Sequence, residues 1–344
     1  MSKPTMQDIA DALSTSRITV WKALNNRPGV SEALRRQILQ KAQELGYGKA
    51  GLSAGAPASP AAARTVAVVV SRPESSLFWM QIVHQLAREL TAQDYNLMYT
   101  YLPTFGEEGY TLPAVLTDGS VAGLIVLNIY SEPLLRLLAE LPLPKVFLDT
   151  VPQVGQQVLG GDLLLLEGRD ALRQITGRLL DSGRTRLSFI GAVDYAQTNH
   201  DRWLGFVDAH ADRGLHCDET LCLKGPFGLY THYEEISRFL DNLPRLPDAF
   251  VCASDYIAHF IRQYYEERRL PAERQPLLTG FDNNPEYTNV AHTITTVEVQ
   301  TSSIGARLAA RILFRLGHPE AFSEVSYICT QVLFRGPLGD AGGA

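Results

Sequence analysis

Apolar residues recur at two different spacings along this chain of 344 residues, and the change of spacing divides it into parts. Within residues 1–47 they fall three and four positions apart, which is the spacing of an amphipathic helix. After residue 64 they form short unbroken runs, typical of strands buried on both faces of a parallel sheet, with helical patterns between them. The pattern therefore predicts a small helical head followed by a long α/β body.

Three short helices are expected in the head. Thr5 and Asp8 resemble a capping box at the start of the first helix. Ser16 is placed to cap a second helix that extends to about Asn25, and Ser31 is placed to cap a third. Three helices of this length, joined by tight turns, are typical of a helix-turn-helix domain.

Strand and helix patterns alternate in the body. About 280 residues are too many for one doubly wound sheet, so we expect two parallel-sheet lobes, similar in architecture to periplasmic binding proteins. Ligands of such sheets bind beyond the carboxyl ends of the strands, which two facing lobes would turn into a cleft. The expected strands lie at 65–70, 95–101, 121–127, 145–149, 187–191, 219–224, 248–253 and 276–281, and two of the helices at 77–93 and 167–182.

Residues 48–64 differ from both neighbours, because 14 of these 17 residues are Gly, Ala, Ser or Pro. Such a stretch cannot bury a core and indicates a linker. The predicted organisation is a head at 1–47, a hinge linker at 48–64, a body at 65–336 and a flexible tail at 337–344. Within the body we expect an N-lobe at about 65–155 and 284–316 and a C-lobe at about 156–283 and 317–336.

The charge of the chain is unevenly spread. Residues 1–50 hold eight basic and four acidic side chains, a net +4, so the rest carries −10 of the total −6. A basic head on an acidic body favours a head that binds a polyanion such as DNA. Hydrophobic residues make up 45% of the chain and charged residues 20%, which excludes a disordered or fibrous chain.

The second predicted helix has two unlike sides when its residues are placed 100° apart. One side carries Val20, Ala23 and Leu24 and can pack on the other helices. The opposite side carries basic, polar and apolar residues, a surface of the kind that enters the major groove of DNA. A protein-interaction domain with a solvated face is the alternative. Trp21 suits packing on the sugar–phosphate backbone or partial burial between helices.

Several stretches of the head are similar to one known family. Thr5–Leu13 reads Thr-Met-Gln-Asp-Ile-Ala-Asp-Ala-Leu, Ser16–Asn25 reads Ser-Arg-Ile-Thr-Val-Trp-Lys-Ala-Leu-Asn, and Val30-Ser31 and Leu45-Gly-Tyr47 follow. In this order, with a linker and a two-lobed body behind them, they resemble the LacI/GalR family of bacterial transcriptional repressors.

The resemblance implies a homodimer that binds a pseudo-palindromic double-stranded operator, with a small effector in the cleft that changes operator affinity. Arg17, Ile18 and Lys22 match the positions at which the family reads bases. The chain ends without the leucine heptads of a tetramerising coil, so we expect a dimer. The DNA-contact candidates are Thr5, Ser16, Arg17, Ile18, Thr19, Trp21, Lys22, Asn25, Arg27 and Leu52.

The chain departs from the family pattern in the turn and in the linker. The family has Ala-Gly-Val-Ser at the turn, whereas this chain has Ala12-Leu-Ser-Thr-Ser16, so Ser14 must make the tight turn. The family's hinge helix places a Leu wedge in the minor groove. Here Ala56 stands where the wedge is expected, and Leu52 is the alternative. Our hypothesis is that this linker does not fold and that the sharp central DNA kink is lost, which an operator-bending assay would test.

Polar residues that follow predicted strands are the candidates for the ligand cleft. Asn128, Asp149, Ser254 and Asp282 each stand just beyond an apolar run, although such an Asp can instead cap a helix. We expect Asp255 to be a cap or structural partner. By resemblance, the loop after the first strand (Ser71, Arg72 and Glu74), the cleft arginine Arg202 and the aromatic platform Phe227 join this set.

A sugar or polyol is the first expectation for the effector, because carboxylates accept two hydroxyl hydrogen bonds. Arg72 and Arg202 also suit a phosphate or carboxylate, and purines and amino acids stay open. The rival interpretations are a receptor of the periplasmic sugar-binding type and a DNA-binding regulator that responds to a protein partner.

No phosphate-binding loop, nucleophile elbow or metal-ligand spacing occurs, so we expect neither an enzyme nor a cofactor. No apolar run reaches the ~18–20 residues of a membrane span, and the amino terminus is polar, so a cytoplasmic protein is expected. The four cysteines show no C-x-x-C spacing and are expected to remain thiols in a reducing cytosol.

Overall fold

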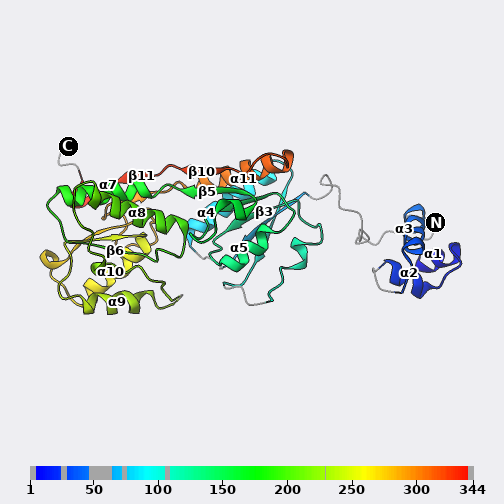
Figure 1. Ribbon diagram of the computed structural model, residues 1–344, viewed down its shortest axis with the longest axis horizontal. Coiled ribbons are helices and arrows are strands. Elements are labelled where there is room, and N and C mark those ends of the chain that lie inside the picture. The colour runs from blue at the N-terminus through cyan, green and yellow to red at the C-terminus, as the bar shows by residue number, and fades with distance from the viewer. Residues whose placement is uncertain are drawn as a thin grey trace. The chain divides into compact units, whose positions relative to one another are not determined.

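The computed structural model describes residues 5–24, 29–45, 64–71, 76–104, 109–228 and 230–339. The chain divides into two units, Met1–Ala63 and Arg64–Ala344. Figure 1 shows the first as a blue group of helices and the second as an α/β body coloured from cyan to red. Nearly all of the predicted linker, with Leu52 and Ala56, lies outside the described residues.

The head consists of α1 (Met6–Ala12), α2 (Arg17–Leu24) and α3 (Glu32–Glu44). The predicted capping box is present, since the Thr5 hydroxyl accepts from the Asp8 N–H (3.4 Å) and the Asp8 carboxylate accepts from the Thr5 N–H (2.6 Å). The Ser16 hydroxyl caps α2 by accepting from Thr19 N (3.1 Å). Ser14 has a positive φ of 48°, so it makes the tight turn between α1 and α2, as predicted.

A small apolar core joins the three helices. Arg35 of α3 donates to the Ala23 carbonyl oxygen at 3.0 Å and thereby satisfies one of the free carbonyl groups at the end of α2. The helix-wheel prediction is confirmed for Val20 and Ala23, which are buried. The core consists of Ile9, Ala10, Val20, Ala23, Ile38 and Ala42.

The N-lobe, as we use the term from here on, is the part of the body built on a six-stranded parallel sheet. The strand order is β10-β5-β4-β3-β1-β2. Its helices are α4 (Leu77–Thr91), α5 (Glu132–Ala139), the short α6 (Gln156–Leu159) and α11 (Thr301–Gly317). The strands are β1 (Thr65–Val70), β2 (Asn96–Tyr101), β3 (Gly123–Leu127), β4 (Lys145–Leu148), β5 (Asp162–Leu166) and β10 (Val325–Ile328).

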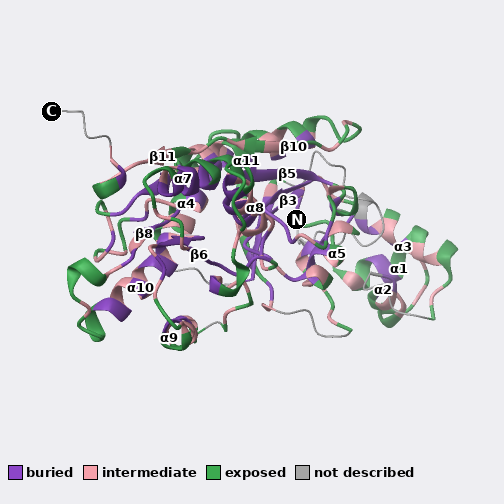
Figure 2. Cartoon of the chain, turned by 60° about the vertical axis from the view of Figure 1, so that its left-hand side comes forward, coloured by how far each residue is buried: buried purple, intermediate pink, exposed green. Residues whose placement is uncertain are grey.

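Both faces of this sheet are covered, as the unbroken apolar runs predicted. Alternate residues of β1 point to opposite faces: Val66, Val68 and Val70 belong to the cluster that contains buried residues of α4 and α11. Ala67 and Val69 belong to the cluster that contains those of α5. Figure 2 shows the buried strands in purple inside the body and the exposed outer turns of its helices in green.

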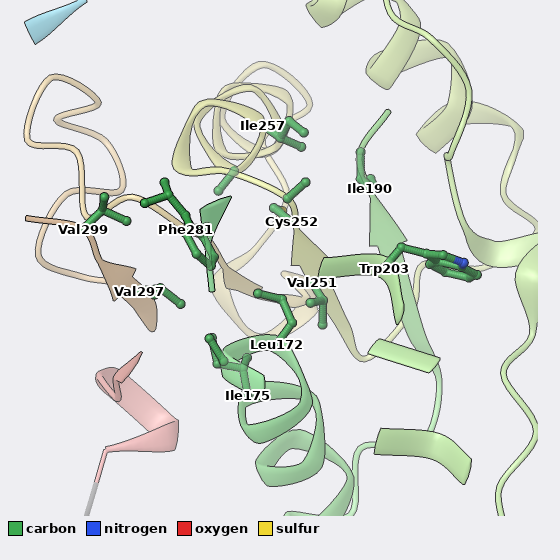
Figure 3. Packing of buried hydrophobic residues seen from close by; sticks show 14 of the residues in the cluster. Leu172, Ile175, Ile190, Trp203, Val251, Cys252, Ile257, Phe281, Val297 and Val299 are labelled. Carbon is green, nitrogen blue, oxygen red and sulfur yellow. The ribbon is translucent and has the colours of Figure 1, made fainter. Parts of the chain in front are cut away.

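The C-lobe is built on a parallel sheet of order β6-β7-β8 and an antiparallel pair, β11 and β9. Leu172 and Ile175 of the first C-lobe helix lie on one side of the sheet, and Ile257 lies on the other (Figure 3). The strands are β6 (Leu187–Ile190), β7 (Ala249–Cys252), β8 (Leu277–Thr279), β9 (Thr296–Glu298) and β11 (Gln331–Leu333), and the helices are α7 (Arg169–Asp181), α8 (Gln197–Ala211), α9 (His232–Asn242) and α10 (Asp255–Glu267).

The predicted lobe boundaries are wrong for three strands. They assigned 296–298 to the N-lobe, but β9 pairs with β11 of the C-lobe. They also assigned 162–166 and 325–328 to the C-lobe, but β5 pairs with β4 and β10 pairs with β5 in the N-lobe sheet. A buried ion pair contributes to this arrangement, because the Asp162 carboxylate lies 3.0 Å from Nε of Arg311 on α11. Asp162 also accepts from the Glu324 N–H at 2.9 Å, which fixes the start of β10 beside β5.

Two further predictions need correction. Residues 219–224 were expected to form a strand, but Glu219–Leu221 is a 3₁₀ turn that the Asp218 carboxylate caps by accepting from the Thr220 N–H (3.1 Å). Of this segment only Leu223 bridges to β6. The tail was expected to be flexible from residue 337, yet Leu338 is buried in another short 3₁₀ turn. The last five residues, 340–344, lie outside the described part.

Candidate functional site

The water-facing side of α2 carries a mixture of side chains that is unusual for a solvated helix. Ile18 is 68% exposed and Trp21 45% exposed, beside the exposed guanidinium of Arg17. The Ser16 and Thr19 hydroxyls are 2.8 Å apart at the start of the helix. Lys22 is half-buried on the same helix, and Thr5 is exposed at the start of α1. Large apolar groups held in water beside cations are typical of a surface that a partner covers.

Three DNA-contact candidates, Asn25, Arg27 and Leu52, fall outside the described residues. The remaining seven candidates lie at the first turns of α1 and α2 or along α2. The buried side chains of Val20 and Ala23 pack α2 against the core of the head. The sequence pattern that builds this core therefore also determines which side chains of α2 face the solvent.

A cavity of about 780 Å³ lies between the N-lobe and the C-lobe. Polar residues at the carboxyl ends of strands in both sheets line it, as the rule for such sheets predicts. Its volume lies in the range of small-molecule sites. Six of the predicted ligand residues line this cavity: Asn128, Asp149, Arg202, Phe227, Ser254 and Asp282.

Of the three other predicted ligand residues, the structure describes one. Ser71 is buried and does not line the cavity; its hydroxyl donates to the Asn128 carbonyl oxygen at 3.3 Å, and so it supports the strand end that does. Arg72 and Glu74 lie outside the described residues. Asp255 has the predicted structural role, since its carboxylate accepts from the Thr296 hydroxyl and the Asn284 N–H.

Asp149 joins the two lobes across the cavity. It follows β4 with a positive φ of 68°, and its carboxylate accepts from the Thr150 N–H (2.8 Å) and from the hydroxyl (2.5 Å) and N–H (3.3 Å) of Thr198. Thr198 lies in the first turn of α8, so Asp149 caps a C-lobe helix from the N-lobe. Burial raises the pKa of Asp149 to about 6, although the hydrogen bonds from Thr198 and Thr150 oppose the shift.

Asp282 and Arg202 form the polar floor on the C-lobe side. The Arg202 guanidinium lies 3.6 Å over the Phe281 ring, donates to the Ala253 carbonyl oxygen (2.6 Å) and approaches an Asp282 oxygen at 4.0 Å. The Asp282 side chain is 24% exposed, with room to accept further hydrogen bonds. Burial raises its pKa to about 7, while Arg202 acts in the opposite direction.

Beside the predicted Phe227, aromatic rings that sequence reasoning missed form much of the cavity wall. On the C-lobe side, Phe227 stacks on His232 (centroids 5.3 Å apart) and His232 meets Tyr256 edge-on. On the N-lobe side Trp79 lies in the first turn of α4, next to Phe78. The missed aromatic residues of the helices stand at positions where an amphipathic helix carries core residues, so the sequence pattern alone did not distinguish them from core residues. Further missed wall residues are Tyr101, Tyr130, Tyr195, Glu286 and Tyr287.

The raised pKa of Asp282 predicts a pH-dependent stability difference between the wild-type chain and Asp282→Asn. The folded state holds the Asp282 proton more tightly than the unfolded state does, because the pKa of this carboxyl group is about 3.8 in the unfolded chain. The contribution of Asp282 to the free energy of unfolding of the wild-type chain is therefore fully present below pH ~4. It falls as the pH rises to ~7 and is constant above that. We expect the stability of Asp282→Asn minus that of wild type to increase by roughly 2–4 kcal/mol across this window.

Thermal or urea unfolding at several pH values measures this difference. The exposed Asp194 provides a matched control, since Asp194→Asn removes the same group from open solvent. A flat difference between pH 4 and 7 for Asp282→Asn would mean that the Asp282 carboxylate is solvated.

Comparison with known proteins agrees with this architecture. Residues 5–49 match the family of bacterial regulatory proteins, lacI family, and residues 176–336 match the periplasmic binding protein-like domain. The transcriptional regulator RegA of Clostridium saccharobutylicum is 26% identical over 327 residues, covering 94% of this chain and 96% of that protein. The regulator CelR of Thermobifida fusca is 26% identical, covering 91% and 92%.

Solved structures share the fold. A complex of the transcriptional regulator CelR with cellobiose has a TM-score of 0.69 at 23% identity and covers 96% of this chain and 99% of its own. A lac repressor dimer bound to operator and an anti-inducer has a TM-score of 0.64 at 17% identity, covering 97% and 98%. None of the helices in the described parts of the chain is long and apolar enough to cross a membrane.

A helix-turn-helix head joined to a periplasmic-binding-protein-like body defines the class of DNA-binding transcriptional regulators that a small ligand modulates. The match of the head and the full-length relatives identify the particular family. The chain belongs to the LacI family of bacterial transcriptional regulators.

Proposed function

We propose that this regulator is a homodimeric repressor that reads its operator with the exposed face of α2. The observation that carries the proposal is the side-chain set on that face: Arg17 and Ile18 are exposed, one suited to guanine and the other to a thymine methyl group. A repressor that acts on chromosomal DNA works in the cytoplasm, and we infer no catalytic activity. Two copies would place two such helices on the half-sites of a pseudo-palindrome.

Substitution of Arg17 tests this assignment. We expect Arg17→Ala to weaken binding to an operator selected from random duplexes by about 5–150-fold and to relax the preference at one base pair in each half-site. Fluorescence anisotropy with the selected operator and single-base variants measures both effects. Arg238→Ala is the control, because it removes the same charge from an exposed site on α9 of the body. Equal losses in both variants would show that Arg17 contributes only general charge.

For the cleft we propose a neutral sugar or polyol as effector. Arg202 is the single Lys or Arg among the described wall residues, and its guanidinium is already bound to Ala253, Phe281 and Asp282. The wall adds the carboxylates of Asp149, Asp282 and Glu286, which disfavour an anion. Aromatic faces with carboxylate acceptors suit a ring that carries apolar C–H faces and hydroxyl groups. The cellobiose in the CelR structure supports this class of ligand.

A thermal-shift panel of neutral sugars, polyols, sugar phosphates, nucleobases and amino acids tests the effector class. A ligand at about 100 times its dissociation constant stabilises the folded chain by roughly 2.7 kcal/mol, a clear shift in melting temperature. We expect a neutral sugar or polyol to give it, and Asp282→Asn but not Asp194→Asn to reduce it. A shift from phosphorylated ligands alone would overturn the assignment. No shift from any class would favour a regulator switched by a protein partner.

A further inference from the structure

A second, smaller cavity lies in the C-lobe, at the opposite end of β8 from the cleft. Its volume is about 180 Å³, and none of the residues that line it also lines the cleft. Leu277 at the start of β8 lines the small cavity, whereas Asp282, just beyond the end of the same strand, lines the cleft. An engineered cavity of about 150 Å³ holds benzene, so the small cavity has room for a ligand of roughly six heavy atoms.

The small cavity has a positively charged lining. Arg262 of α10 and Arg335, which follows β11, are both half-buried in its wall, and no carboxylate lines it within the described part of the chain. Neither arginine forms an ion pair with a carboxylate of the described residues. The cleft has the opposite balance, since three carboxylates and one arginine line it there. Two guanidinium groups without a counter-charge favour an anionic ligand.

Arg262 is held in position by a neutral partner. The Gln275 side chain donates from Nε2 to the Leu270 carbonyl oxygen (2.7 Å), and its Oε1 accepts from Nη1 of Arg262 (2.8 Å). Nε of Arg262 is buried and has no acceptor among the residues that the structure describes. Because an amide holds this guanidinium, it is oriented without being neutralised. Its remaining edge, Nε and Nη2, is one with which arginine binds a carboxylate through two parallel hydrogen bonds.

Arg335 is placed by its own backbone. The Thr295 hydroxyl accepts from the Arg335 N–H (2.9 Å) and donates to the Arg335 carbonyl oxygen (3.1 Å). Gly336 follows with a positive φ of 54° and begins the 3₁₀ turn that buries Leu338 in the cavity wall. The end of the described chain thus closes one side of the small cavity and fixes the second arginine there.

The rest of the wall is largely apolar. Leu278, Ile294 and Leu338 are buried around the cavity. An inorganic oxyanion would use the arginines alone, whereas a short organic acid would also cover these apolar side chains. We propose that the small cavity is a second ligand site, separate from the cleft, that binds a small carboxylate with a short apolar tail. The carboxylate lies at Arg262 and Arg335, and the tail lies against Leu278 and Ile294.

The test uses the full-length protein with butyrate as the probe. Butyramide serves as the neutral analogue of the same size and inorganic phosphate as the alternative anion, all at one ionic strength set with chloride. Saturation-transfer-difference NMR titrations measure the three affinities. We expect butyrate to bind at least about tenfold more tightly than either of the others, and Arg335→Gln to weaken butyrate binding at least about tenfold.

Two further variants make the test specific to the cavity. Arg274→Gln removes the same charge from an exposed position in the adjacent 3₁₀ turn and should change butyrate affinity less than about twofold. Ala272→Phe fills the cavity from its exposed rim, leaves both arginines in place and should abolish butyrate binding. The melting temperature of each variant without ligand shows that it is folded.

Three results would overturn the proposal. Tighter binding of phosphate than of butyrate would make the cavity a site for inorganic oxyanions. Equal losses in Arg335→Gln and Arg274→Gln would show that butyrate responds only to the general charge of this surface. Undiminished binding in a folded Ala272→Phe variant would place butyrate elsewhere on the protein.

Discussion

Ile38→Asp is expected to abolish operator binding while the body keeps its melting temperature and its response to effector. Ile38 lies on α3, away from the DNA-reading face of α2, and is fully buried among a handful of apolar side chains. An unpaired carboxylate there costs several kcal/mol, more than a core of this size supplies. The head would unfold and operator affinity would fall more than ~100-fold, although no DNA-contact candidate has changed.

Gln37→Asp is the matched control, since it places the same charge on an exposed position of the same helix. Operator affinity is read by fluorescence anisotropy and the body by its own thermal transition. Binding retained within about tenfold in Ile38→Asp would mean that the head does not depend on this core. A body that melts several degrees lower would mean that the two units fold together.

The head was predictable because its determinants are local. Capping residues, a 3.6-residue period and tight turns lie within a few positions of each other, and the structure places Thr5, Ser16 and Ser14 in those roles. The first body strand, β1, was found for a similar reason, since a run of valines has few alternatives.

The lobe boundaries depended on contacts that are distant in sequence. β5 joins the N-lobe because Asp162 meets Arg311 on α11 and the start of β10. Its apolar part is four leucines that run directly into a helical pattern, so periodicity could not separate strand from helix. Likewise 219–224 has strand-like residues, but the Asp218 side chain caps a turn there instead.

The cavity was predictable to the extent that strand ends determine it. Asn128, Asp149, Ser254 and Asp282 follow from the rule for parallel sheets, which needs only the strand positions. The aromatic wall does not follow from it. Tyr256 occupies a helical position that equally suits a core residue, and only the facing of two lobes turns it toward the cavity.

Arg202→Met is expected to have the largest effect on the cleft, because the Arg202 side chain contacts three other residues there. Its guanidinium donates to the Ala253 carbonyl, covers Phe281 and faces Asp282. Methionine keeps much of the apolar contact but leaves a buried carbonyl unbonded and the Asp282 carboxylate without its cation. We expect a stability loss of about 2–4 kcal/mol and a further rise in the pKa of Asp282.

Effector affinity should fall at least ~30-fold in Arg202→Met, and Arg202→Lys should fall between that variant and wild type. Lysine restores the charge near Asp282, but its ammonium cannot both stack on Phe281 and reach the Ala253 carbonyl. Isothermal titration with the sugar or polyol found in the panel measures affinity, and unfolding without ligand measures stability.

Arg173→Met makes the same substitution on the neighbouring helix α7, where the Arg173–Asp212 pair is about half exposed and therefore screened by solvent. We expect Arg173→Met to change neither the stability nor the effector affinity appreciably. The two measurements separate the two roles of Arg202. A variant that loses stability but binds effector as tightly as wild type would make Arg202 a support of the C-lobe only. Loss of both, with recovery by lysine in proportion to the charge restored near Asp282, would place the Arg202–Asp282 pair at the effector itself.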